Sequence, residues 1–135
     1  MRRANPDDVS ALAEMRLDFL RTVKTLEGKA AEQAFVDQRD MFSRELTEGR
    51  MHAWVYESDG RILASCAFRV ERTIPGRGAE LLAVYTRPEV RRRGIASTLL
   101  SETIAGARAQ GIPRLTLQAT ADSRRLYLAT GFIES

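Results

Sequence analysis

The stretch that most constrains the fold of this chain is residues 79–100, AELLAVYTRPEVRRRGIASTLL. It begins with an apolar run typical of a strand, turns at Pro88, crosses three arginines and a glycine, and continues with apolar residues at helical spacing. A glycine before a helix allows a close backbone approach, and the first helical turn leaves its N–H groups unpaired. With Arg91, Arg92 and Arg93 beside it, this helix start is predicted to bind phosphates.

Two motifs resemble those of a known family. The spacing Arg91-x-x-Gly94-x-Ala96 resembles the pyrophosphate loop of the Gcn5-related N-acetyltransferase (GNAT) superfamily. A later segment, residues 119–132, resembles the second conserved block of that family through its Leu-Tyr-x-x-x-Gly-Phe ending. Both motifs occur in the family's order and separation, and the resemblance covers essentially the whole chain.

The resemblance implies a function and a cofactor. The chain is expected to transfer the acetyl group of acetyl-CoA to a primary amine by direct attack in a ternary complex. The strand before the loop would pair with the pantetheine, and a backbone N–H at Val84 or its neighbour would support the oxyanion. Ala83 stands where similar proteins often have asparagine. The residues expected to bind acetyl-CoA are Ala83, Val84, Tyr85, Arg91, Arg92, Arg93, Gly94, Ile95, Ala96 and Ser97.

Two residues are expected to be catalytic. The second motif implies that Tyr127 donates its phenolic proton to the departing thiolate, the other interpretation being a core tyrosine. A lysine-type amine has a pKa of about 10.4, so a base or a water chain must remove a proton from it. Glu80, the carboxylate of the central strand, is the first candidate for that base. The alternative is a surface carboxylate that pairs with Arg77 or Arg87.

Hydrophobic periodicity and turn residues predict the elements around these motifs. Helices are expected over residues 5–24, 30–47, 96–111 and about 123–130, and strands over 51–57, 62–72, 79–85 and 115–119. A hairpin turn is expected at Asp59-Gly60, and a loop over 73–78. The order α-α-β-β-β-α-β-α predicts a GNAT-like α/β fold with a mixed, mostly antiparallel sheet flanked by helices. The final strand of the family would be short or missing.

Length and composition set broad limits. A chain of 135 residues predicts one domain, residues 1–135. No apolar run approaches the roughly 18 residues that span a bilayer, and no secretory signal is visible, so a cytoplasmic protein without a membrane partner is expected. The lone Cys66 is expected to be a buried structural thiol, and His52, without ligands at suitable spacing, gives no metal site.

Two other functions were weighed. A nucleic-acid-binding module built on Arg91–Arg93 is disfavoured, because the aromatic content is only 7%. Acidic residues are also interspersed among the basic ones, and the net charge is only +3. A catalytically inactive acyl-CoA-binding sensor or partner protein on the same fold is the second alternative. The sequence leaves open the acceptor, which could be a small molecule, a peptide N-terminus, a lysine side chain or an antibiotic. It also leaves open whether the chain forms a homodimer.

Overall fold

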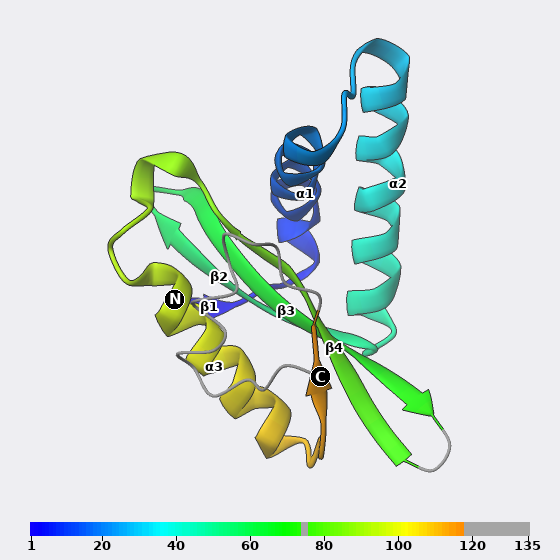
Figure 1. The fold of residues 1–135 in the computed structure, drawn as a ribbon, viewed down its shortest axis with the longest axis vertical. Helices are drawn as coiled ribbons and strands as arrows, with labels where there is room; N and C mark the ends of the chain where they lie inside the picture. Colours follow the sequence, from blue (N-terminus) through cyan, green and yellow to red (C-terminus); the bar gives the residue numbers. More distant parts are fainter. Residues whose placement is uncertain (74–75, 118–135) are drawn as a thin grey trace.

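The computed structural model describes residues 1–73 and 76–117, which form a five-stranded sheet with helices on both faces (Figure 1). The strands are β1 (Arg2–Arg3), β2 (Met51–Ser58), β3 (Arg61–Thr73), β4 (Gly76–Thr86) and β5 (Leu115–Thr116). The helices are α1 (Val9–Val23), α2 (Gly28–Thr47) and α3 (Ile95–Ala109), with short 3-10 turns η1 (Pro6–Asp8) and η2 (Pro88–Val90). The last predicted helix lies outside the described residues.

The strands lie in the order β1-β2-β3-β4-β5, and all neighbours are antiparallel except β4 and β5, which are parallel. The parallel pair is the one that α3 connects, as expected for a strand-loop-helix crossover. The predicted α/β fold with a mixed, mostly antiparallel sheet is therefore confirmed. None of the helices in residues 1–73 and 76–117 is long and apolar enough to cross a membrane.

The first helix starts as the sequence predicts, with reciprocal capping. The Asn5 side chain accepts a hydrogen bond from the Asp7 N–H at 2.9 Å, and the Asp8 carboxylate accepts one from the Asn5 N–H at 2.8 Å. The preceding strand β1 was not predicted, because two arginines carry no alternation of apolar and polar residues. It forms only through pairing with β2, where Arg2 lies opposite Val55.

The hairpin connections show where local signals succeed and fail. Asp59 and Gly60 both have positive φ, 54° and 76°, which is the geometry of the predicted two-residue turn. The predicted loop over 73–78 is wrong in its length, because β3 continues to Thr73 and β4 begins at Gly76. Turn-forming residues gave the loop signal, but pairing between the two strands extends the ladder past them. Helix α2 likewise begins two residues earlier than expected, at Gly28.

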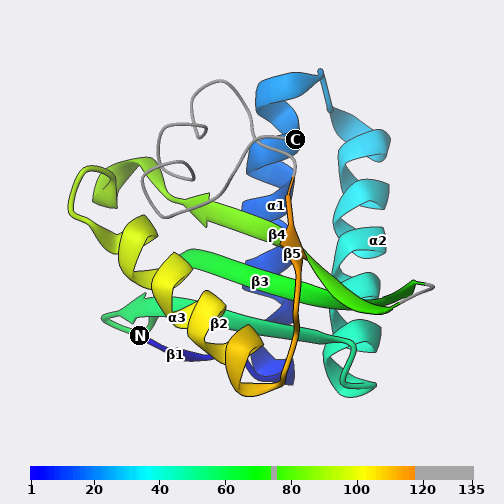
Figure 2. The same ribbon diagram turned by 60° about the horizontal axis from the view of Figure 1, so that its bottom comes forward.

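Each face of the sheet has its own core, with α3 on one face and α1 and α2 on the other (Figure 2). Under α3, a Cβ on Gly106 would lie 2.2 Å from the Trp54 ring, so this glycine lets the helix approach the sheet. Cys66 is buried in the same core, and burial raises its pKa to about 12. The prediction of a buried structural thiol is therefore confirmed. Helix α1 and helix α2 cover the opposite face through Leu12, Met15 and Phe42.

Candidate functional site

Strand β4 carries a bulge in its second half. Ala83 and Val84 together stand opposite Cys66 alone on β3, so β4 has one residue more than its partner. Ala83 has a φ of 53°, and its carbonyl accepts a hydrogen bond from the buried Ser65 hydroxyl at 2.6 Å. A bulge bends its strand and leaves a backbone group outside the ladder. The bulge and its Ser65 support could not be inferred from the sequence, because Ser65 is one polar residue within an apolar strand.

Beyond Glu80, one edge of β4 has no strand beside it among the described residues. The parallel pairing with β5 consists of Ala79 with Leu115 and Glu80 with Thr116. Strand β4 then continues to Thr86 through the bulge. Ala83, Val84 and Tyr85, which the sequence predicts to contact the donor, lie on this part of β4.

The loop after β4 ends in a helix start that offers N–H donors. Arg92 and Gly94 both have left-handed backbone, with φ of 66° and 74°. Gly94 caps α3 without a side chain, and its carbonyl accepts the hydrogen bond of the Thr98 N–H at 3.1 Å. The N–H groups of the first helical turn, residues 95–97, have no backbone acceptor among the described residues. They present the positive end of the helix dipole to the loop.

These residues line a hollow of about 210 Å³. Its walls consist of Thr86, Val90, Arg91, Arg92, Gly94, Ile95, Ala96 and Ser97. The structure thus brings together most of the loop residues that the sequence singles out. Arg93 is exposed and does not line the hollow. A Cβ placed on Gly94 would meet no atom within 4 Å, so the space above this glycine is open to a ligand.

Arg91 packs against the Tyr85 ring at the end of β4. Arg91 Nε donates a hydrogen bond to the Thr86 carbonyl at 2.9 Å, and its guanidinium lies 5.8 Å from the centroid of the Tyr85 ring. Burial and the charge of Asp18 raise the pKa of Tyr85, so the ring remains a neutral phenol. The guanidinium is anchored through one nitrogen, and its two terminal nitrogens remain to bind an anion.

Glu80 lies on β4 directly opposite Arg69 of β3, and the two form an ion pair of 3.6 Å. The alternative prediction, that Glu80 pairs with Arg87, is wrong. Its side chain is buried, lies 3.2 Å from Glu14 and 3.5 Å from Asp18, and donates a hydrogen bond from Nε to the carbonyl of residue 62 at 3.0 Å. Arg87 therefore ties β4 to β3 and α1. The side chain of the other expected partner, at position 77, is not among those described.

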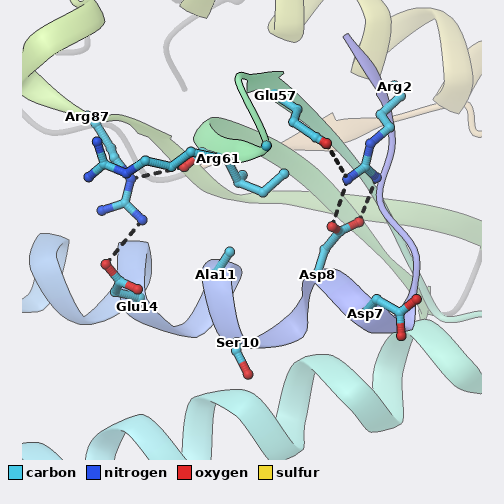
Figure 3. A pocket seen from close by; sticks show the side chains of 11 residues that line it. Arg2, Asp7, Asp8, Ser10, Ala11, Glu14, Glu57, Arg61 and Arg87 are labelled. Carbon is cyan, nitrogen blue, oxygen red and sulfur yellow. Dashed lines mark hydrogen bonds and ion pairs between the residues drawn. The ribbon is translucent and has the colours of Figure 1, made fainter.

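A larger hollow, of about 380 Å³, lies between the start of α1 and the β2–β3 hairpin (Figure 3). Several of its charged side chains bind one another. Arg2 makes two hydrogen bonds to the Asp8 carboxylate, at 2.7 and 2.8 Å, and lies 3.4 Å from Glu57. The hydrogen bonds from Arg2 hold the pKa of Asp8 below its usual range. This network fastens β1 and η1 to the sheet.

His52 lines neither hollow, and Tyr127 is not among the described residues. The expected catalytic role of Tyr127 is therefore a prediction from the sequence. His52 packs against Phe68 with ring centroids 5.1 Å apart, and burial lowers its pKa. In residues 1–73 and 76–117, no group of three His, Cys, Asp or Glu side chains could hold a metal ion.

Comparison with known proteins agrees with this geometry. Residues 13–132 match the model of the Acetyltransferase (GNAT) family, so the chain belongs to that family and is an acyltransferase. No curated protein matches the chain.

Three solved structures illustrate the shared fold. A predicted acetyltransferase with acetyl-CoA from Clostridium acetobutylicum has a TM-score of 0.88 at 23% identity, over 99% of this chain and 89% of that one. A GCN5-related N-acetyltransferase from Ralstonia eutropha JMP134 has a TM-score of 0.88 at 24% identity, over 99% and 92%. Glucosamine-6-phosphate N-acetyltransferase from Arabidopsis thaliana has a TM-score of 0.76 at 16% identity, over 99% and 90%.

Proposed function

We propose that this protein transfers the acetyl group of acetyl-CoA to a primary amine by direct attack in a ternary complex. The observation that carries the proposal is the start of α3. There, N–H groups without a backbone acceptor among the described residues, the open face of Gly94 and two arginines line one hollow at the end of a bulged strand. Such an arrangement binds phosphate groups. The similar Clostridium acetobutylicum structure, which contains acetyl-CoA, supports the choice of donor.

In the proposed complex, the donor extends along β4. Its pyrophosphate accepts hydrogen bonds from the N–H groups of residues 95–97 and from the guanidinium groups of Arg91 and Arg92. Its pantetheine lies along the edge of β4 beyond Glu80, the last residue that pairs with β5. The thioester then reaches the bulge at Ala83 and Val84, where a backbone N–H outside the ladder can donate to the thioester oxygen.

Starting from its ammonium form, the acceptor nitrogen loses two protons, and the departing thiolate gains one. Glu80 accepts a proton from the ammonium form of the acceptor, directly or through water, and the neutral amine attacks the thioester carbonyl. The N–H at the bulge stabilises the oxyanion that forms. As the C–S bond breaks, Tyr127 protonates the departing thiolate, and the nitrogen of the intermediate gives its second proton to the resulting tyrosinate, directly or through water. The proton held by Glu80 passes to solvent. The products are an N-acetylated amine and CoA with a free thiol.

The proposal is tested by incubating the protein and acetyl-CoA with a library of amines and detecting the released thiol. We expect acetyl-CoA binding by calorimetry and thiol release with at least one class of amine. Donor binding without thiol release from any amine would instead support the inactive acyl-CoA sensor. Tight binding of an oligonucleotide, with no effect of acetyl-CoA on thermal stability, would contradict both.

Replacing Glu80 tests the proposed base. Glu80→Gln removes the proton acceptor, so we expect kcat to fall about 100-fold at neutral pH. Glu71→Gln is a matched control, because Glu71 also pairs with Arg69, at 3.7 Å. An equal loss of kcat in both variants would show that the ion pairs matter and that Glu80 is not the base.

Replacing Tyr127 tests the proposed acid. Tyr127→Phe removes the phenolic proton and keeps the ring, so we expect kcat to fall at least about tenfold. The affinity for acetyl-CoA, measured by calorimetry, should stay nearly constant. Unchanged turnover in this variant would remove the general-acid role while leaving the donor site intact.

A further inference from the structure

Arg3 of β1 lies opposite Trp54 of β2 at the outer edge of the sheet (Figure 2). Residues directly opposite each other on two strands share one face of the sheet, here the face that α3 covers. Trp54 lies beneath Gly106 of α3 and stacks on Phe68 of β3, with ring centroids 5.9 Å apart. The guanidinium of the exposed Arg3 lies over the Trp54 ring, 5.1 Å from its centroid. Arg3 thus covers the outer edge of a buried aromatic cluster.

His52 holds the Arg3 side chain in this position. Nη2 of Arg3 lies 2.6 Å from Nδ1 of His52, and the His52 ring stacks on Phe68 with centroids 5.1 Å apart. A guanidinium has N–H donors and no acceptor, so Nδ1 of His52 must accept this hydrogen bond. Nδ1 accepts only when it carries no proton, so His52 is neutral with its proton on Nε2. The contact therefore specifies the protonation state of the only histidine in the sequence.

Protonation of His52 is incompatible with this contact. Both ring nitrogens of a histidine cation are donors, so Arg3 would lose its acceptor, and two positive charges would lie side by side. The neighbouring elements contribute Phe68 of β3, Gly106 of α3 beside the cluster and the backbone of Gly49 before β2, so Arg3 is the charged group among these contacts. Burial and the charge of Arg3 lower the pKa of His52, and the hydrogen bond with the Gly49 backbone opposes them.

We propose that Arg3, His52 and Trp54 form a pH-sensitive closure at the edge of the sheet: Arg3 covers the Trp54 ring while His52 is neutral and leaves it when His52 is protonated. In the open form His52 has its ordinary pKa of 6.5. The closed form is therefore fully favoured above pH 6.5 and is lost as the pH falls through the lowered value. The closure is independent of the proposed acetyl transfer, because none of its three residues lines either hollow.

The test follows the two aromatic residues separately. The sequence contains one histidine and one tryptophan, so the NMR signal of the His52 ring and the fluorescence of Trp54 need no further assignment. As the pH is lowered over the range in which circular dichroism shows an intact fold, we expect His52 to titrate with a midpoint below 6.5. Quenching of Trp54 fluorescence by acrylamide should rise with the same midpoint. Quenching that stays constant while His52 titrates, or a midpoint at or above 6.5, would overturn the proposal.

Two variants separate the release of Arg3 from the charge of the histidine itself. His52→Gln keeps a side-chain carbonyl that can accept from Arg3 at every pH, so quenching should stay low and lose its dependence on pH. Arg3→Ala removes the guanidinium, so quenching at neutral pH should already equal that of the wild-type protein in acid. The midpoint of His52 should also rise toward 6.5 in this variant.

Arg108→Ala is the matched control, because it removes an exposed arginine of α3 and changes the net charge equally. It should behave as the wild-type protein does in both measurements. Thermal unfolding of each variant checks that the fold is retained. If Arg3→Ala shows the same rise of quenching in acid as the wild-type protein, or if Arg108→Ala abolishes that rise, Arg3 does not cover Trp54 in the way proposed.

Discussion

The two hollows described above differ in how their hydrogen-bonding groups are satisfied. The larger, of about 380 Å³, is lined by Arg2, Asp8, Glu14, Glu57 and Arg87, whose charges bind one another (Figure 3). The smaller, of about 210 Å³, is lined by the start of α3, whose N–H groups have no backbone acceptor among the described residues.

On the proposed function, the donor binds at the hollow whose N–H groups have no backbone acceptor among the described residues, and not at the hollow of larger volume. Buried and half-buried polar groups need partners, and in the larger hollow the protein supplies them. In the smaller hollow, the described residues supply no backbone acceptor for the N–H groups of residues 95–97. We therefore expect changes in the smaller hollow to affect donor binding, and changes in the larger hollow to affect stability.

The largest effect is expected at Gly94. Gly94→Val places a branched side chain in the open space above the helix start and forces valine into left-handed backbone. We expect the affinity for acetyl-CoA, measured by calorimetry, to fall by about 100-fold or more. Gly49→Val is the control, because Gly49 has a similar φ of 76° and open space around it, but ends α2. Equal loss of affinity in both variants would assign the effect to backbone strain.

The second-largest effect, on stability, is expected at Asp8 in the larger hollow. Asp8→Asn weakens charged hydrogen bonds to Arg2, so we expect the free energy of unfolding at pH 7 to fall by about 2 kcal/mol, roughly thirtyfold in the folding equilibrium. The affinity for acetyl-CoA should not change. Asp7→Asn, at the exposed neighbouring position, is the control and should have little effect.

The contribution of Asp8 to the stability of the fold should depend on pH. Because the hydrogen bonds from Arg2 lower the pKa of Asp8 in the folded protein, this stabilisation is complete well above the ordinary value of 3.8. It is lost as the pH falls below 3.8 and through the lowered folded value. The stability difference between the wild-type protein and Asp8→Asn, measured by denaturant unfolding, should therefore shrink over that range. A difference independent of pH would show that packing is responsible.

The smallest effect is expected from the arginines of the loop. Replacing Arg92 and Arg93 together by glutamine removes two exposed cations beside the helix start, so the affinity for acetyl-CoA should fall about tenfold. Its dependence on salt should also become weaker. Arg61→Gln removes a cation from the larger hollow, where it pairs with Glu89 at 2.9 Å, and should change the affinity less than about twofold. Similar losses from both changes would indicate a general effect of net charge.

The sequence by itself predicted most of the helices and strands and the loop for which we propose phosphate binding. The strand, loop and helix over residues 79–100 are specified by local signals: an apolar run, a proline, and a glycine that can take the left-handed conformation found at Gly94. Hydrogen-bonded caps and turns, such as Asn5 and Asp59-Gly60, are also local, because they join residues within a few positions of each other.

Only the tertiary structure decided which side chains meet. Strand β1, the extended β3–β4 pairing and the bulge at Ala83 depend on a register between distant strands, which no window of sequence contains. For the same reason, the partners of Arg87 are Glu14 and Asp18, and the partner of Glu80 is Arg69. Local backbone preferences act over a few residues, whereas the pairing of charges depends on how helices pack on the sheet.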